Sequence, residues 1–149
     1  MSAAAAGGES HDVMRNRDVF TLIELMIVVV VIGILAALAI PNYTSLQDHA
    51  KVAGTNSNAH TLQLALENYA ATHDGVYSAA AADITPLLPG QGMLANTFTG
   101  ARSEPQFGAA AAAPGEVGVE LILQNGIPVG YRITAAGKNG VVTTLSSGQ

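Results

Sequence analysis

The sequence predicts an α+β protein in which a long N-terminal α-helix packs against a small three-stranded antiparallel β-sheet. Three observations predict this fold: a long apolar run near the N-terminus, an amphipathic helical pattern that continues it, and three β-rich runs separated by turn signals. A chain of 149 residues has the length of one domain, so the helix and the sheet are expected to share one hydrophobic core.

The apolar run extends from Leu22 to Ile40, and its one charged residue is Glu24. As a helix rising about 1.5 Å per residue, the run would span roughly 28 Å, close to a hydrocarbon core of about 30 Å. A carboxylate is costly in such a segment and marks a functional position. No Lys or Arg lies three or four residues away, so its partner must be water, a lipid headgroup or another molecule.

The flanks of the apolar run set its expected orientation. Arg15 and Arg17 precede the run, and the next basic residue after it is Lys51. Basic residues favour the cytoplasmic side, so the N-terminus is expected in the cytoplasm and the C-terminal part outside. Residues 1–13 are small, polar and unpatterned, and Met14 is a second plausible start of translation.

A helical pattern resumes after Pro41 and is expected to run from about Asn42 to Thr72, where Asp74-Gly75 supplies a stop signal. The stretch from Gly54 to Asn58 is a poor helix former, and a bend is predicted there. Gly33 and Pro41 mark further weak points, since glycine lowers helix propensity and proline removes an amide donor. A short capped turn of helix is expected over 83–88, with Asp83 or Thr85 as the cap, and an irregular loop over 89–115.

The C-terminal part contains the expected sheet. Residues 117–123, 127–134 and 141–146 alternate or are rich in β-formers, and Asn125-Gly126 is a strong signal for a two-residue hairpin turn. Pro128 lacks an amide donor, so it is expected at a strand start or on an unpaired side.

Composition and spacing argue against catalytic and metal chemistry. The chain has no cysteine, so it has neither a disulfide framework nor a thiolate metal site. His49 and His60 would lie about 16 Å apart on one helix and cannot share a metal ion. The acids of the C-terminal region that could bind calcium are too spread out to form a site: Glu104, Glu116 and Glu120. No enzyme, metal or cofactor is therefore predicted, and the scattered basic residues predict no specific contact with nucleic acid.

The segment "FTLIELMIVVVVIGILAALAIPNY", residues 20–43, resembles the N-terminal segment of type IV pilins and of the pseudopilins of type II secretion. The resemblance implies that a prepilin peptidase cuts between Val19 and Phe20 and methylates the new amine of Phe20. It also implies that Glu24 of one subunit pairs with the Phe20 ammonium of its neighbour. Gly33 and Pro41 would bracket a stretch of the assembly helix that unwinds partly in a fibre.

The resemblance further implies a division into a leader at 1–19, a transmembrane and filament-core helix at 20–41, and an exported globular domain at 42–149. The protein would be a structural subunit of a type IV pilus or of a related type II secretion filament. Its partners would be the prepilin peptidase, further copies of itself and other pilins, an inner-membrane assembly platform with its ATPase, and membrane lipid. It would begin as a single-pass inner-membrane protein and end in a cell-surface or periplasmic filament.

An alternative stays open at the processing site. The family nearly always has glycine before the cut, whereas this sequence has Val19, preceded by Asp18 where a basic residue is common. If the leader stays attached, Glu24 has no ammonium partner. The chain would then be an uncleaved single-pass membrane anchor for an external binding module. The lack of a Pro-Gly-Arg-Pro-Tyr-like stretch, which recurs in major pseudopilins, favours a pilin over a major pseudopilin. The missing cysteine pair means that the chain has no disulfide-closed C-terminal loop of the kind that many pilins carry.

Overall fold

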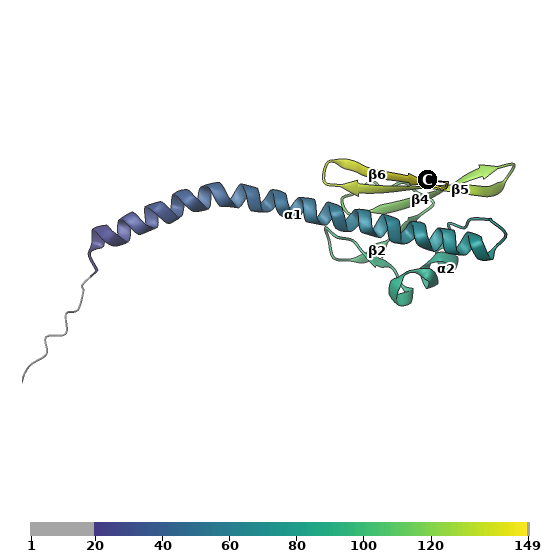
Figure 1. Ribbon diagram of the computed structural model, residues 1–149, viewed down its shortest axis with the longest axis horizontal. Coiled ribbons are helices and arrows are strands. Elements are labelled where there is room, and N and C mark those ends of the chain that lie inside the picture. Colours follow the sequence, from purple (N-terminus) through teal and green to yellow (C-terminus); the bar gives the residue numbers. More distant parts are fainter. Residues whose placement is uncertain (1–19, 149) are drawn as a thin grey trace, which may run out of the picture. The chain divides into compact units, whose positions relative to one another are not determined.

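A computed structural model of the chain describes residues 20–148 (Figure 1). Its contacts divide the chain into two compact units, with the boundary between Ile40 and Pro41. The described part of the first unit is the start of helix α1 (Leu22–Thr72), and the second unit holds the rest of α1 and every strand. The predicted fold class is confirmed: a long N-terminal helix and a small, mostly antiparallel sheet form an α+β protein.

Helix α1 in the second unit buries one face. Its buried residues recur at helical spacing: Thr55, Ala59, Leu62, Ala65, Leu66 and Ala70. The helix ends at Thr72, where Asp74 and Gly75 adopt positive φ angles of 53° and 79° and the Gly75 amide donates to the Ala70 carbonyl at 2.9 Å. The Asp74-Gly75 stop signal is therefore confirmed, because glycine enters this left-handed conformation without strain.

The bend predicted at Gly54–Asn58 is wrong, since α1 continues through this stretch without a break. Its weak helix formers are used for contacts with the domain. A Cβ at Gly54 would lie 2.8 Å from the Thr97 side chain, and the Thr55 hydroxyl hydrogen-bonds that of Thr97 at 2.7 Å. The Asn58 amide donates to the Ala95 carbonyl at 2.9 Å. Tertiary contacts thus override the low propensity of this stretch.

The main sheet has four strands in the order β3-β4-β5-β6. The strands β4 (Val117–Gln124), β5 (Ile127–Gly137) and β6 (Gly140–Ser146) form the predicted antiparallel meander. The addition to the predicted three-stranded sheet is β3 (Gln106–Phe107), which pairs parallel with β4. A separate antiparallel pair, β1 (Leu94–Ala95) with β2 (Arg102–Glu104), lies in the segment that was expected to be irregular.

The turn between β4 and β5 is the predicted two-residue hairpin. Asn125 and Gly126 have φ angles of 54° and 83°, the two positive values that a type I′ turn requires. Pro128 stands at the second position of β5, near the strand start as expected, next to a register shift at Ile122/Leu123.

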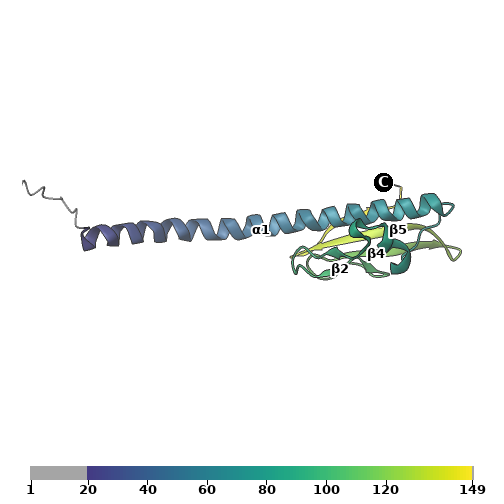
Figure 2. The same ribbon diagram turned by 90° about the horizontal axis from the view of Figure 1, so that it is seen from below.

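The core lies between the second half of α1 and one face of the sheet, as Figure 2 shows. Leu62 and Leu66 from the helix meet Val117, Tyr131 and Ile133 from the strands, all fully buried. Burying an aliphatic or aromatic side chain contributes roughly 1.5–3 kcal/mol, so this contact holds the sheet to the helix.

The predicted cap at Asp83 or Thr85 is wrong. Helix α2 (Ala81–Ile84) begins earlier, so Asp83 lies inside it, and the Ser78 hydroxyl donates to the Asp83 carboxylate at 2.6 Å. Two 3-10 turns follow, Thr85–Leu87 and Pro89–Gln91, and Pro86 lies in the first turn of the former. Ile84 and Leu88 from this segment are buried in the core.

Candidate assembly site

The N-terminus of α1 carries a side-chain cap that the sequence analysis missed. The amide of Glu24 donates to the Thr21 hydroxyl at 3.3 Å, one position before the helix begins at Leu22. Thr-x-x-Glu is the sequence signature of a capping box, so the spacing of Thr21 and Glu24 was a readable signal. An acid in the first turn also interacts favourably with the helix dipole. The backbone amide and the carboxylate of Glu24 therefore both favour a helix start at this position.

The apolar segment of the first unit is exposed. None of the residues from Leu22 to Ile40 is buried, and the large side chains at its two ends, Leu22 and Ile40, are 77% and 62% exposed. By length and composition, α1 is long and apolar enough to cross a membrane. Such a continuous apolar surface needs lipid or another protein surface to cover it.

Within residues 20–148, the Glu24 carboxylate has no ion-pair partner. Phe20 lies just before the capping Thr21, and it is exposed, as is Glu24. The described part of the chain thus places Phe20 and Glu24 about one helical turn apart but brings no cation to the acid. Val19, the other residue of the predicted processing site, lies outside the described residues.

Gly33 has no neighbour that requires a glycine. A Cβ added at this position would meet no atom within 4 Å beyond its local helical backbone. Glycine in a helix interior costs about 1 kcal/mol relative to alanine. In the described residues, no contact of Gly33 offsets that cost.

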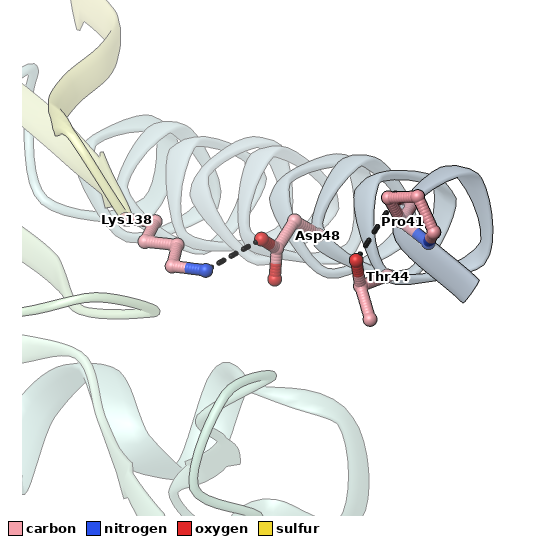
Figure 3. Close-up of polar contacts among 4 residues, drawn as sticks. All are labelled: Pro41, Thr44, Asp48 and Lys138. Atoms are coloured by element: carbon pink, nitrogen blue, oxygen red, sulfur yellow. Dashed lines mark hydrogen bonds and ion pairs between the residues drawn. The ribbon is translucent and has the colours of Figure 1, made fainter. Parts of the chain in front are cut away.

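Pro41 is the first residue of the second unit and lies inside helix α1 (Figure 3). The hydroxyl of Thr44 donates to the Pro41 carbonyl at 2.9 Å. One turn further, Lys138 from the β5–β6 turn donates to the Asp48 carboxylate at 2.8 Å. This contact with Lys138 holds the pKa of Asp48 below its usual range. The ion pair joins the start of the domain helix to the sheet.

The other charged side chains of α1 in the second unit also turn toward their own domain. The ammonium of Lys51 lies 5.4 Å from the ring centroid of Phe98. The Glu67 carboxylate accepts hydrogen bonds from the hydroxyls of Tyr131 at 2.6 Å and Tyr77 at 3.2 Å. All three charged residues of this stretch, Asp48 included, are only partly exposed.

The exposed positions of α1 between Pro41 and Thr72 therefore carry no Asp, Glu, Lys or Arg. A helix face exposed to water usually carries charged side chains. This face instead mixes apolar and small residues with uncharged polar ones; among the former are Tyr43, Leu46 and Leu64, and among the latter Gln47 and Asn68. The exposed face of this part of α1 is therefore polar in places but carries none of the four charged residue types.

Two of the three acids that are candidate calcium ligands, Glu104 and Glu116, have structural roles. Glu104 is fully buried, and its oxygens accept hydrogen bonds from the Asn96 amide, the Ser103 hydroxyl and the Val117 backbone amide at 2.9–3.1 Å. Glu116 accepts from the backbone amides of residues 112 and 113 at 2.8 and 2.7 Å. Among the residues that the structure describes, no group of three His, Cys, Asp or Glu side chains is placed to hold a metal ion.

Comparison with known proteins identifies the class of the N-terminal segment. Residues 15–40 match the family model of the prokaryotic N-terminal methylation motif. The chain is 48% identical over 60 residues to the type IV major pilin protein PilA of Myxococcus xanthus, which covers 40% of this chain and 27% of that protein. It is 46% identical over 55 residues to the type II secretion system core protein G of Pseudomonas aeruginosa, covering 37% of this chain and 39% of the relative.

The type IV major fimbrial protein FimA of Dichelobacter nodosus is 50% identical over 48 residues, 32% of this chain and 31% of its own. The chain thus spans between about a quarter and two fifths of the length of these relatives. Their names are those of structural filament and secretion components, not of enzymes, as the sequence analysis expected. No solved structure matches the chain. The chain carries an N-terminal methylation motif and has homologues among type IV pilins and type II secretion pseudopilins.

Proposed function

We propose that the protein is a structural subunit of a type IV pilus or of a related type II secretion filament. The observation that carries this proposal is the exposed apolar segment of α1, which coincides with a matched methylation motif and contains a single acid. Such a segment can be covered first by lipid and then by the equivalent segments of other copies. Relatives named pilin, fimbrial protein and secretion core protein support the same role.

The first step of the proposed pathway is cleavage between Val19 and Phe20, followed by methylation of Phe20. The methylation motif extends across this bond. Cleavage there would keep the helix start intact, because Thr21 and Glu24, which form the cap, both lie after the cut. The products are a leader at 1–19 and a mature chain with an assembly helix at 20–41 and an exported domain at 42–149.

The second step is pairing between subunits. The new amine of Phe20 has an ordinary pKa of about 7.7–8.0, and methylation keeps it basic. In surroundings of low dielectric constant, an ammonium and a carboxylate attract strongly, whereas either charge alone is heavily penalised. Glu24 therefore selects the axial offset at which it meets the Phe20 ammonium of a neighbour. This gives the acid a function in selecting the register of the filament.

Two features of the helix support a packed final state. Within residues 20–148, a Cβ at Gly33 would meet no atom beyond the local helix backbone, and glycine there would let a neighbouring helix approach closely. The exposed face of α1 beyond Pro41 lacks charged side chains, so another protein surface can cover it without leaving a charge unpaired. Pro41, which lacks an amide donor, is where we expect the helix to unwind most readily during assembly.

The partners follow from this pathway. A prepilin peptidase cuts the leader, and an inner-membrane platform with its ATPase inserts the subunit next to further copies and other pilins. The chain starts as a single-pass inner-membrane protein with a cytoplasmic N-terminus, in contact with membrane lipid. It ends in a cell-surface or periplasmic filament.

The proposal is tested by shearing the surface of cells that produce the chain and examining the released material by electron microscopy with an antibody against the domain. Labelled filaments are expected from the wild-type chain and not from cells in which the peptidase is deleted. Chain found only in the membrane fraction of the wild-type cells, with no labelled filament in the sheared or periplasmic material, would overturn the proposal.

One observation favours a second candidate function. Val19 puts a β-branched side chain at the bond where the family nearly always has glycine. A leader that resists the peptidase would leave an uncleaved membrane anchor with an external binding module. In that case Glu24 would act as the helix cap with Thr21, and no filament would form.

A further inference from the structure

The chain contains two Asn-Gly pairs, Asn125-Gly126 and Asn139-Gly140, and each lies at a hairpin turn of the main sheet. Figure 1 shows the two turns, β4–β5 and β5–β6, at opposite ends of the sheet. An asparagine followed by glycine is prone to a reaction within the chain, in which the backbone nitrogen of the glycine attacks the side-chain carbonyl carbon of the asparagine. Glycine favours this attack because it has no side chain to obstruct the approach.

The β4–β5 turn leaves the reacting atoms of Asn125 and Gly126 free to meet. Both residues are exposed, and the strand pairing closes just outside them, between Gln124 and Ile127. Within residues 20–148, neither the side chain of Asn125 nor the backbone amide of Gly126 has a hydrogen-bond partner. A Cβ added at Gly126 would meet no atom within 4 Å, so there is room for a cyclic imide to form at this position.

The β5–β6 turn holds the glycine of its Asn-Gly pair in the sheet. Gly140 is the first residue of β6, and its partner across the strands is Gly137 of β5. The amide of Ser147 donates to the Tyr131 carbonyl, so every second residue of β5 from Tyr131 onward directs its backbone polar groups at β6, Gly137 included. The Gly140 amide must therefore leave this pairing before it can attack Asn139.

Contacts with helix α1 also distinguish the two turns. Lys138, directly before Asn139, is tied to α1 by its 2.8 Å ion pair with Asp48. In the part of the chain that the structure describes, no side chain of residues 123–127 makes a hydrogen bond or an ion pair. The β4–β5 turn can therefore change its backbone conformation without breaking a polar side-chain contact, whereas the β5–β6 turn cannot.

From these observations we propose that Asn125 is a site of spontaneous deamidation in the folded protein, and that the fold protects Asn139 from the same reaction. The nitrogen of Gly126 gives its proton to a solvent base and bonds to Cγ of Asn125, and the bond from Cγ to the side-chain nitrogen breaks with release of ammonia. Water then opens the cyclic imide at either of its carbonyls, which leaves aspartate or isoaspartate. The reaction consumes only water, and it does not depend on the proposed function.

The reaction changes the charge of this end of the domain. Residues 121–131 contain no Asp, Glu, Lys or Arg, and both products add a carboxylate at position 125. Aspartate keeps the turn, because Asp-Gly also favours the type I′ conformation. Isoaspartate lengthens the main chain by one carbon, so it no longer fits a two-residue turn. The hairpin therefore becomes anionic, and in part distorted, as the protein ages.

Peptide mass spectrometry of the full-length chain tests the proposal, with Asn139 as the control within the same molecule. The folded chain is kept in a neutral detergent and a mildly alkaline buffer, in water enriched in heavy oxygen, and is digested in ordinary water. The heavy label then marks each asparagine that became an acid during the incubation. We expect Asn125 to take up the label roughly tenfold faster than Asn139, the factor that corresponds to one hydrogen bond. A methyltransferase specific for isoaspartate should modify the peptide that contains residue 125.

The same incubation in guanidinium chloride removes the fold and provides the reference rates. There the two asparagines should react at nearly equal rates, because a glycine follows each of them. Equal rates in the folded chain, or a faster reaction at Asn139, would overturn the proposal. So would a folded chain whose Asn125 stays unlabelled over a period in which the unfolded chain reacts at both positions.

Discussion

The hydroxyl of Tyr131 on strand β5 donates a 2.6 Å hydrogen bond to the carboxylate of Glu67 on helix α1. Tyr131 is fully buried, and Tyr77 donates to the same carboxylate from the loop that follows the helix. The rings of the two tyrosines meet edge to face, with their centroids 5.1 Å apart. The Glu67 carboxylate thus links helix α1 to both the sheet and the loop through hydrogen bonds.

We expect Tyr131→Phe to lower the free energy of unfolding by about 1–2 kcal/mol, because hydrogen bonds to charged groups are among the stronger ones. The ring would still fill its place in the core, so the loss would report the hydroxyl alone. Denaturant titration of the full chain in a neutral detergent measures the change. Tyr43→Phe, at a site 63% exposed, is the control and should leave stability unchanged. Equal stability of Tyr131→Phe and wild type would show that the bond contributes nothing.

Stability should fall in alkaline solution. Burial and the neighbouring Glu67 raise the pKa of Tyr131 well above its ordinary value of about 10. Between the unfolded and the folded pKa, the unfolded chain binds fewer protons than the native chain, so the free energy of unfolding decreases as pH rises. Unfolding curves at about pH 8 and about pH 11 should therefore differ more for wild type than for Tyr131→Phe. The same pH dependence in both chains would contradict the assignment to this tyrosine.

Gly54→Ala should destabilise the domain despite alanine's better helix propensity. The new Cβ would lie 2.8 Å from the Cγ2 methyl of Thr97, and overpacking of this kind costs typically 1–3 kcal/mol. Thr97→Ser removes that methyl but keeps the hydroxyl that bonds Thr55. The double variant should therefore regain most of the lost stability, measured by thermal unfolding. If Gly54→Ala alone raises the melting temperature, the close approach is not a constraint.

Features of the fold that depend on local conformation could be predicted from the sequence, whereas those that depend on distant contacts could not. The Asn125-Gly126 hairpin and the end of α1 at Thr72 were predictable, because each depends on a local conformation that few residues adopt. Gly54 was misread as a bend because its reason is a contact with Thr97, far along the chain. The strand β3 has two residues and no pattern of its own, so only its pairing with β4 reveals it. The cap at Thr21 was readable but overlooked.

The candidate site likewise has features that the sequence predicts and features that only the folded structure shows. The apolar segment and its single acid could be predicted from the sequence, because a long run of apolar residues with one charge is recognisable from composition alone. It did not predict that Asp48, Lys51 and Glu67 all turn toward the domain, since their partners Lys138, Phe98 and Tyr131 come from distant segments. The uncharged outer face of α1 emerges only when these contacts are known.

Replacing the acid of the apolar segment tests its role in pairing. We expect Glu24→Gln to insert into the membrane normally, because it removes a charge, and to enter filaments poorly, because the Phe20 ammonium then has no partner. Fractionation and quantitative electron microscopy measure the two properties. The control is Thr21→Ala, which removes the cap hydrogen bond but keeps the charge. Filament yield equal to wild type from Glu24→Gln alone would remove the pairing role.

Val19→Gly should accelerate leader removal, because glycine takes away the β-branched side chain at the bond that the peptidase must reach. Pulse labelling followed by gel separation of precursor and mature chain gives the rate. Val19→Ile, which keeps the branching, should process no faster than wild type. Identical kinetics for all three chains would mean that this side chain does not limit processing.

The central claim is that a new amine at Phe20 of one subunit meets Glu24 of the next. Mass spectrometry of the N-terminal peptide of chain purified from its source cells tests this claim most directly. The account predicts a peptide that begins with N-methylated Phe20. A mature population that retains residues 15–19 ahead of Phe20 would contradict it, because Glu24 would then have no ammonium to pair with.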